Sequence, residues 1–226
     1  MTNRKKKTVV WIIANTDGAI YRFRNSLLKK LVKDYRVETF SDVSMEGSYE
    51  PALREIGCNY NRAGFKLNLT AAKSIMRFVK YFYSQRPKII LVYTLPSILI
   101  FSVASFLFFY ETKKIGTVTG LGRNFTQDIN VKNWKTLILC QFMKILLHRF
   151  DHIIFQNNED RIFCIQQNIV SEKNSTVVSG SGIDLEEAKS SYPNLLRATY
   201  KYLFLGRGLK EKGILTFYDV AERFRN

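Results

Sequence analysis

The residues that first call for a chemical explanation are two arginines, Arg22 and Arg24, in the stretch "NTDGAIYRFR". The stretch joins an apolar, strand-like run to a helix-like pattern, so both arginines are predicted in the first turns of a helix. The amino end of a helix carries partial positive charge, and arginines there must be solvated or face an anionic group. Residues two apart lie about 200° apart around a helix, so the two cannot face one ligand. We expect Arg22 to face the anion and Arg24 to be solvated or paired with an acid.

Three predicted loops combine glycines with Lys or Arg, and the first of them contains Arg22 and Arg24. Gly18 precedes Arg22, and exposed amides at a helix amino terminus attract anions that a glycine lets approach closely. Each loop alone could be an ordinary tight turn, since "GLGRNF" lacks the third glycine of a dinucleotide fingerprint and no Walker A pattern occurs. The two later loops, "TGLGRNF" and "FLGRGLKEKG", contain Gly120, Gly122, Arg123, Arg207 and Lys212.

Residues for nucleophilic or metal chemistry are scarce. The three cysteines, Cys58, Cys140 and Cys164, are far apart and form no Cys-x-x-Cys pair. This spacing is typical of buried thiols in a reducing compartment, so we expect neither disulfides nor a metal site, and no cofactor. No Ser-His-Asp or Cys-His arrangement is recognisable, and no catalytic residue is assigned.

Strand-like and helix-like runs alternate along the chain, which predicts an α/β fold with a Rossmann-like parallel sheet covered by helices on both faces. Ligands of such sheets bind beyond the carboxyl ends of the strands, where the glycine loops would lie. The predicted strands are "TVVWIIA", "RVETF", "KIILVYT", "KKIGTVT", "DHIIFQ", "NSTVVSG" and "YKYLFLG", and the predicted helices are "NSLLKKLVK", "TAAKSIMRFVKYFYSQ", "PSILIFSVASFLFFYETK", "NWKTLILCQFMKILLHRF", "NEDRIFCIQQN" and "KEKGILTFYDVAERF".

The uncharged segment 89–110 is long enough to span a bilayer. Pro96 divides it, however, and favours a buried strand followed by a helix with proline in its first turn. We therefore expect two elements rather than a transmembrane span.

The stretch after Gly180 is rich in Ser, Gly and acidic residues, which is typical of a linker. We predict an N-terminal Rossmann-like domain over 1–180, a linker over 181–199, and the first strand and helix of a second, incomplete domain over 200–226.

Thirty-five Lys and Arg against 19 Asp and Glu give the 226-residue chain a formal net charge of +16. Such a charge suits nucleic acid, an anionic membrane surface or a phosphorylated ligand. The cations are spread over many elements and no nucleic-acid motif is recognisable, so nucleic acid is not expected. The aromatic, basic segment "KSIMRFVKYFYSQR" favours contact with anionic lipid.

Five segments, in this order, resemble family 4 glycosyltransferases of the GT-B fold: "IANTDGAIYRFRNSLLKKLVKDYRVETFSD", "TVTGLGRNFT", "DHIIFQNNEDRIFCI", "VVSGSGID" and "FLGRGLKEKGILTF". The resemblance covers nearly the whole chain and is strongest to bacterial enzymes that move a sugar from a UDP-sugar to a lipid-linked or saccharide acceptor. It implies a hexosyl or N-acetylhexosaminyl transferase of surface glycan synthesis, cytoplasmic and peripheral on the inner face of the plasma membrane. The alternative is a non-catalytic basic module that binds anionic lipid or nucleic acid.

The resemblance also implies roles for individual residues. Arg207 and Lys212, with Gly18, would bind the donor diphosphate. The acceptor side of the cleft would be formed by Asp17, Tyr21, Arg22, Gly120, Gly122 and Arg123. The family's Glu-x7-Glu element and its cleft histidine have no counterpart here, so we expect a C-terminally truncated chain that is inactive alone.

Overall fold

The computed structural model describes residues 7–64, 70–108, 110–121, 134–182, 185, 202–206, 208 and 210–224. The chain divides into two units, Met1–Asp184 and Leu185–Asn226, and each is described by itself.

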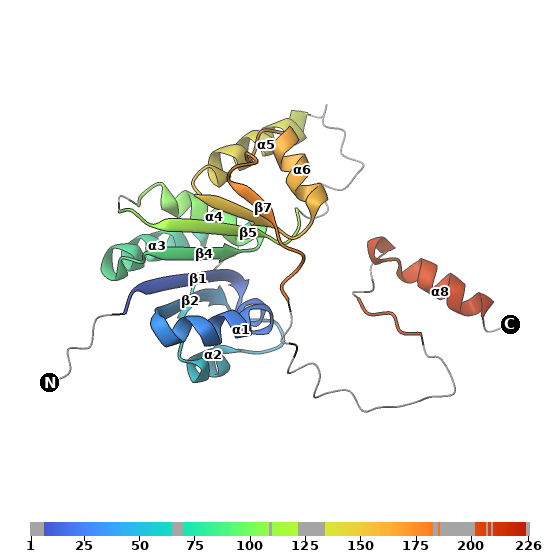
Figure 1. Ribbon diagram of the computed structural model, residues 1–226, viewed down its shortest axis with the longest axis horizontal. Helices are drawn as coiled ribbons and strands as arrows, with labels where there is room; N and C mark the ends of the chain where they lie inside the picture. The colour runs from blue at the N-terminus through green and yellow to red at the C-terminus, as the bar shows by residue number, and fades with distance from the viewer. Residues whose placement is uncertain are drawn as a thin grey trace. The chain divides into compact units, whose positions relative to one another are not determined.

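The first unit is built on a parallel sheet of seven strands in the order β3-β2-β1-β4-β5-β6-β7 (Figure 1). The chain runs from β1 outward to β3 and then returns to place β4 on the other side of β1. The predicted Rossmann-like sheet is thereby confirmed, and its strand order reverses between β1 and β4. The strands are β1 (Val9–Thr16), β2 (Arg36–Asp42), β3 (Asn59–Arg62), β4 (Ile89–Tyr93), β5 (Lys113–Val118), β6 (His152–Phe155) and β7 (Ser175–Val177).

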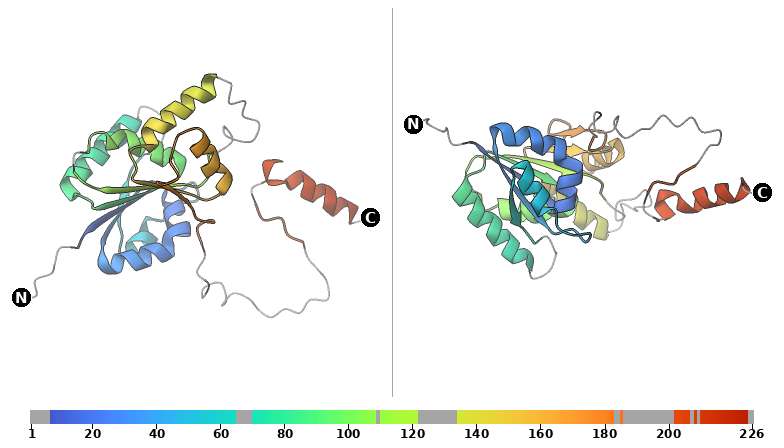
Figure 2. Two further views of the ribbon diagram at one scale, coloured as in Figure 1. Left: turned by 45° about the horizontal axis from the view of Figure 1, so that its top comes forward. Right: turned by 90° about the horizontal axis from the view of Figure 1, so that it is seen from below.

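Helices cover both faces of this sheet (Figure 2). Helices α1 and α2 pack on one face over β1 to β3, while α3, α4 and α5 lie side by side on the other. The bounds are α1 (Asp17–Asp34), α2 (Glu50–Ile56), α3 (Thr70–Gln85), α4 (Leu95–Ser105), α5 (Trp134–Leu147) and α6 (Asn158–Gln166), the last beside β6 and β7.

Alternation along β1 explains the two cores. Trp11 and Ile13 point into the cluster beneath α3 and α4, and Ile12 points into the cluster beneath α1 and α2. The Trp11 ring centroid lies 4.6 Å from that of Phe40, and its Nε1 donates to Gln85 Oε1 at 2.8 Å. Strand β1 is therefore buried on both faces, as its nearly continuous apolar sequence requires.

The segment 89–110 forms β4 followed by α4, as predicted. The helix ends earlier than expected, at Ser105, because Phe108 turns inward and stacks on Phe82 with ring centroids 3.8 Å apart. Arg149 caps this end by donating from Nη2 to Ser105 O at 3.0 Å. Among the described residues, no helix combines the length and the apolar character needed to cross a membrane.

Two elements escaped the sequence analysis, namely α2 and β3. Pro51 in the first turn and Gly57 in the left-handed conformation at the C-cap bound α2, while β3 is a short, polar edge strand. The three cysteines are free and buried, as expected.

The strand predicted over 200–206 is wrong for its described part, since residues 202–205 have no strand assignment. A strand needs a neighbour for its ladder hydrogen bonds, and no strand is found among the described residues of the second unit. The predicted helix is present as a 3-10 turn at Lys210–Lys212 followed by α8 (Ile214–Arg223). Most of the predicted linker lies outside the described residues, as does Asn133, the first residue of the predicted helix "NWKTLILCQFMKILLHRF".

Candidate ligand-binding edge of the sheet

The candidate site is the carboxyl edge of the sheet where the strand order reverses. In open α/β sheets this reversal opens a crevice, because the crossovers on its two sides leave in opposite directions. Here the β1–α1 corner and the β4–α4 corner flank it. The predicted residues Asp17, Gly18, Tyr21 and Arg22 belong to the first corner.

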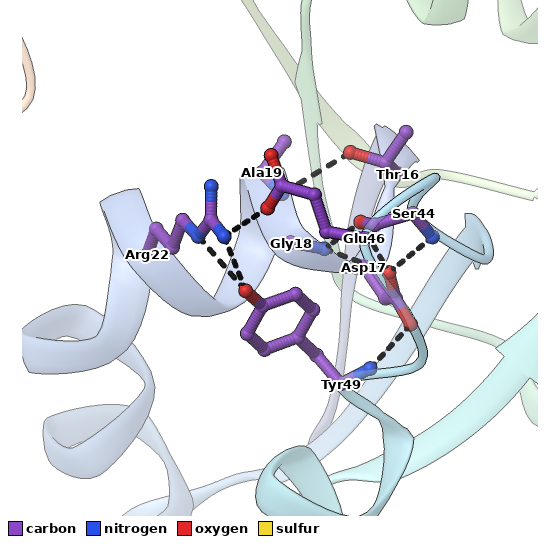
Figure 3. Close-up of polar contacts among 8 residues, drawn as sticks. All are labelled: Thr16, Asp17, Gly18, Ala19, Arg22, Ser44, Glu46 and Tyr49. Carbon is purple, nitrogen blue, oxygen red and sulfur yellow. Dashed lines mark hydrogen bonds and ion pairs between the residues drawn. The ribbon is translucent and has the colours of Figure 1, made fainter.

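Asp17 is fully buried and holds the β1–α1 corner against the segment between β2 and α2 (Figure 3). Its Oδ1 accepts from the amides of Gly18 and Ser44, both at 2.8 Å, and from Ser44 Oγ at 2.6 Å. Its Oδ2 accepts from the amide of Tyr49 at 2.7 Å and from Ser48 Oγ at 3.4 Å. Both carboxylate oxygens are thus engaged within the chain, and Asp17 positions the 43–49 loop.

The charge of Asp17 is set by two opposing effects. Burial raises the pKa of the carboxyl group, and the hydrogen bonds from Ser44 Oγ and from the amides of Tyr49, Ser44 and Gly18 lower it further than burial raises it. The net result is a pKa below the usual value, so the carboxylate is ionised at neutral pH.

Gly18 lets the 43–49 loop approach the helix closely. A Cβ atom at this position would lie 2.6 Å from Ser44 Oγ and 3.1 Å from Tyr49 Cε2. The Gly18 amide donates to Ser44 Oγ at 2.8 Å, and the Ala19 amide donates to the N-cap oxygen, Thr16 Oγ1, at 3.2 Å. Gly18 was expected to let a ligand approach the backbone closely. In the structure, Ser44 and Tyr49 of the same chain occupy this position.

Tyr21 and Arg22 cover the outside of this loop. The Tyr21 ring stacks on that of Tyr49, with centroids 5.3 Å apart. Arg22 donates from Nε to Tyr49 Oη at 3.0 Å and forms an ion pair with Glu46. Hydrogen bonds to Glu46 and then to Tyr49 raise the pKa of Arg22, and Figure 3 shows its remaining nitrogen turned away from both partners.

Arg24 differs from the expectation that it is solvated or paired with an acid. It shares the sheet-facing side of α1 with Ile20 and Leu28, four residues before and after it. Its guanidinium carbon lies 4.1 Å from the centroid of the Tyr93 ring, and Nη1 donates to Phe23 O at 3.0 Å. Its Nε is buried without a partner in the described structure, and burial lowers its pKa. Arg24 is therefore the cation held at the end of β4, beside the point of reversal.

The β4–α4 corner carries backbone strain. Thr94, the N-cap of α4, has φ 72° and ψ 140°, a conformation that a β-branched residue rarely adopts. Its amide donates to Thr117 O at 3.0 Å, and its hydroxyl lies 3.1 Å from Ser97 Oγ. These contacts to β5 and α4 hold the strained residue in place.

The β5 corner contributes Gly120. This residue has φ +154°, and nothing lies within 4 Å of the place a Cβ would occupy. The next amide, that of Leu121, donates to Asp160 Oδ2 at 3.1 Å, which ties the loop to the amino end of α6. Gly122 and Arg123 lie outside the described residues.

The second unit carries the remaining predicted residues. Lys212 is exposed at the end of the 3-10 turn, whereas Arg207 lies outside the described residues. No group of three His, Cys, Asp or Glu that could hold a metal is found in the part of the chain that the structure describes.

Sequence reasoning missed the residues that organise the corner, namely Ser44, Glu46, Tyr49 and Tyr93. The turn-rich "VSMEGSYE" after a predicted strand was a signal for a loop at the carboxyl edge. Nothing in it indicated that its partner would be Asp17, which lies 27 residues before Ser44.

No family model and no curated protein matches the chain. Solved structures do match it. Anabaena HepE in complex with UDP and glucose is 12% identical with a TM-score of 0.54, over 78% of this chain and 45% of that one. The fold is that of a GT-B half. A lipopolysaccharide outer core galactosyltransferase, WaaB, gives 10%, a TM-score of 0.52 and coverages of 75% and 45%.

The same fold also serves another reaction. The UDP-GlcNAc 2-epimerase of Methanocaldococcus jannaschii matches with 13% identity and a TM-score of 0.50, over 76% of this chain and 46% of that chain. The chain therefore spans about half the length of each of these proteins, and the likeness establishes the GT-B half fold.

Proposed function

We propose that this chain is the acceptor-side half of a glycosyltransferase that moves a sugar from a UDP-sugar to a lipid-linked or saccharide acceptor. We further propose family 4 membership and a role in bacterial surface glycan synthesis. The observation that carries the proposal is the seven-stranded sheet with its reversal between β1 and β4, in a fold whose solved examples include one holding UDP and glucose. The formal net charge of +16 favours substrates that carry phosphate.

The donor diphosphate would be bound by Arg207 and Lys212 within the "GRGLKEKG" segment, and Gly18 would contribute through the corner that it shapes, because its own amide donates to Asp17 Oδ1 and Ser44 Oγ. Two fixed cations on a diphosphate stabilise the charge that grows on the leaving UDP, a term on the order of 3 kcal/mol per well-placed group. We propose no cofactor or metal for this chemistry.

The acceptor would be held at the edge described above. Tyr21, Arg22 and Gly120, with Gly122 and Arg123, are proposed to contact it, and Asp17 to hold the loop that positions Tyr21 and Arg22. Arg24 joins this set because it is half-buried at the reversal and has no acidic partner among the described residues. A phosphate on the acceptor is the group best suited to such a cation.

The boundaries proposed for this arrangement are an acceptor-side domain over 1–180, a linker over 181–199 and the start of a donor-binding domain over 200–226. We place the protein in the cytoplasm, peripheral on the inner face of the plasma membrane, where a lipid-linked acceptor would be reached. The net charge of +16 supports attraction to the anionic lipids of that surface.

Titration of the chain with UDP tests the donor proposal, followed by calorimetry or by NMR. Lys212→Ala and Arg207→Ala should each weaken UDP binding about ten-fold or more, as expected for a charge-assisted contact. Lys210→Ala, a cation in the same exposed 3-10 turn, is the matched control and should leave binding unchanged. Equal losses at Lys210 and Lys212 would reduce the effect to general charge and contradict the assignment.

The reaction itself is tested with the chain joined to a complete donor domain and supplied with labelled UDP-GlcNAc or UDP-glucose. Transfer of label to a lipid-phosphate or saccharide acceptor supports the proposal. Conversion of the free UDP-sugar to its 2-epimer would instead favour the epimerase that shares the fold. Vesicle binding without any UDP binding would favour the non-catalytic basic module.

A further inference from the structure

Three neighbouring helices on one face of the first unit carry no acidic residue. Segment 56–110, which contains α3 and α4, has no Asp or Glu, and neither has α5. These helices lie side by side on the face of the sheet opposite α1 and α2 (Figure 2). The charged residues of these three helices are therefore all cations, and they lie on α3 and α5.

Helix α5 exposes apolar side chains that no other part of the described first unit covers. Its inner side buries Cys140, Met143, Leu146 and Leu147 in the core. The outer side has a second stripe at helical spacing, with Ile138 60%, Phe142 48% and Ile145 58% exposed, and Leu137 next to it. A surface helix needs one apolar stripe, and a second one marks a surface with an interaction partner.

The end of α4 continues this apolar surface. Val103, Phe106 and Leu107 are exposed at the end of α4, which packs between α3 and α5, and the Arg149 guanidinium carbon lies 4.7 Å from the Phe106 ring centroid. Lys144 of α5 is also exposed. Cations thus lie directly at the margin of the apolar stripe.

Helix α3 adds cations in a row on the other side of α4. Lys73, Arg77 and Lys80 are exposed at intervals of four and three residues, and Met76 is exposed among them. An apolar stripe that shares its face with cations, on helices that carry no acid, is complementary to an anionic lipid bilayer rather than to water. A protein partner with an acidic surface would match the charges and would leave the stripe of α5 without an apolar counterpart.

We propose that the α3–α4–α5 face is a membrane-docking surface, in which Ile138, Phe142 and Ile145 insert at the headgroup–acyl boundary and the α3 cations contact anionic headgroups. This inference rests on the proposed function, since a lipid-linked acceptor requires contact with its membrane. The sequence predicted contact with anionic lipid for the α3 segment alone. The present proposal assigns electrostatic attraction to α3 and insertion to α5. Insertion resists salt, whereas attraction between exposed charges is screened by it.

The test is sedimentation of the chain with phosphatidylcholine vesicles, with and without phosphatidylglycerol, at low and high salt. The wild-type chain should bind the anionic vesicles and retain part of this binding at high salt. Phe142→Glu should lower the partition coefficient roughly ten-fold, because it places a charge in the inserted stripe. The triple change of Lys73, Arg77 and Lys80 to Gln should remove the salt-sensitive part and spare the rest.

Phe23→Glu is the matched control, since Phe23 is 56% exposed on α1, on the opposite face of the sheet. It should bind vesicles as the wild type does. Equal loss in Phe142→Glu and Phe23→Glu, or a wild-type chain that ignores anionic vesicles, would overturn the docking surface. Far-UV circular dichroism checks that both variants remain folded.

UDP titration of the same variants separates this inference from the proposed function. Phe142→Glu should bind UDP like the wild type but should bind vesicles more weakly. This result would support the docking surface. Unchanged vesicle binding by Phe142→Glu in a chain that binds UDP overturns the docking surface alone. A wild-type chain that binds vesicles in the predicted pattern but no UDP contradicts the proposed donor and leaves the docking surface supported.

Discussion

The β1–α1 corner and the outer side of α5 differ in whether their side chains have partners within the chain. At the β1–α1 corner, the polar atoms of a buried carboxylate are satisfied by a loop from the same chain, through Ser44, Ser48 and Tyr49. On the α5 side, Ile138, Phe142 and Ile145 remain exposed with no covering element in the described first unit. The first region is completed within the chain, and the second calls for a partner outside it.

Mutations in the two regions should therefore have different effects. Changes to the buried Asp17 and its contacts should act on folding, because the groups removed have partners that would be left buried and unpaired. Changes on α5 should act on association and leave stability nearly intact, because half-exposed side chains contribute little to the core.

Asp17→Ala should have the largest effect, lowering the free energy of unfolding by about 3 kcal/mol or more. It removes the acceptor of three backbone amides, those of Gly18, Ser44 and Tyr49. Urea denaturation followed by circular dichroism measures the loss. Asp34→Ala, an exposed acid at the other end of the same helix, is the control and should be nearly neutral. Equal effects at both positions would contradict the anchoring role of Asp17.

The same carboxylate predicts a pH dependence. Its pKa in the folded state lies below its unfolded value, so its contribution to stability is complete above about pH 4 and is lost as pH falls through the folded pKa. Between about pH 4 and pH 2 the wild type should therefore lose more stability than Asp17→Asn, which cannot titrate there. Parallel profiles for the two proteins would show that other carboxyl groups govern the acid transition.

Gly18→Ala should lower the unfolding free energy by about 1–3 kcal/mol, because the new methyl group would overlap Ser44 Oγ at 2.6 Å. Adding Ser44→Gly removes the overlapping atom, so the double variant should cost less than the sum of the two single changes. Strict additivity of the two changes would mean that the close contact is relieved by movement of the loop.

Much of this fold follows from the sequence, and the reasons for the exceptions are physical. The sequence predicted the six strands β1, β2, β4, β5, β6 and β7, each of which contains β-branched residues, and helix α3 has its predicted bounds. Strand β3 was missed because "NYNR" is polar. It forms by pairing with β2 through Thr39 and Tyr60, a long-range contact that local pattern does not record.

The site was predictable only in part. The sequence located Asp17, Gly18 and Arg22 at a strand–helix corner, and the structure places them there. Partners 26 to 32 residues further along, such as Ser44 and Tyr49, depend on the tertiary fold. Arg24 is different, since its spacing of four from Ile20 and Leu28 was available and predicts a sheet-facing position. Its position over the Tyr93 ring could not be predicted from this spacing, because it depends on β4 lying next to β1 in the sheet.

Arg24→Met should change stability by no more than about 1 kcal/mol, since it removes a cation–π contact and also the cost of a half-buried charge with an unpaired Nε. If Arg24 binds a phosphate of the acceptor, the same change should weaken pyrophosphate binding about ten-fold in an NMR titration. A stable variant with impaired binding would identify a residue kept for a ligand. Unchanged binding would limit Arg24 to its contact with Tyr93.

Arg22 should show the smallest effect on stability, because its ion pair with Glu46 is exposed and screened by water. The pair nevertheless distinguishes two roles for Arg22 when it is compared with Glu46→Gln in a pyrophosphate titration. If Arg22 contacts an acceptor phosphate, Arg22→Ala should weaken binding, and Glu46→Gln should strengthen it by releasing the guanidinium from a competing anion. If the pair only fastens the 43–49 loop over Tyr49, both changes should shift binding in the same direction. In that case Arg24, on the side of α1 that faces the sheet, would be the arginine that binds the acceptor phosphate.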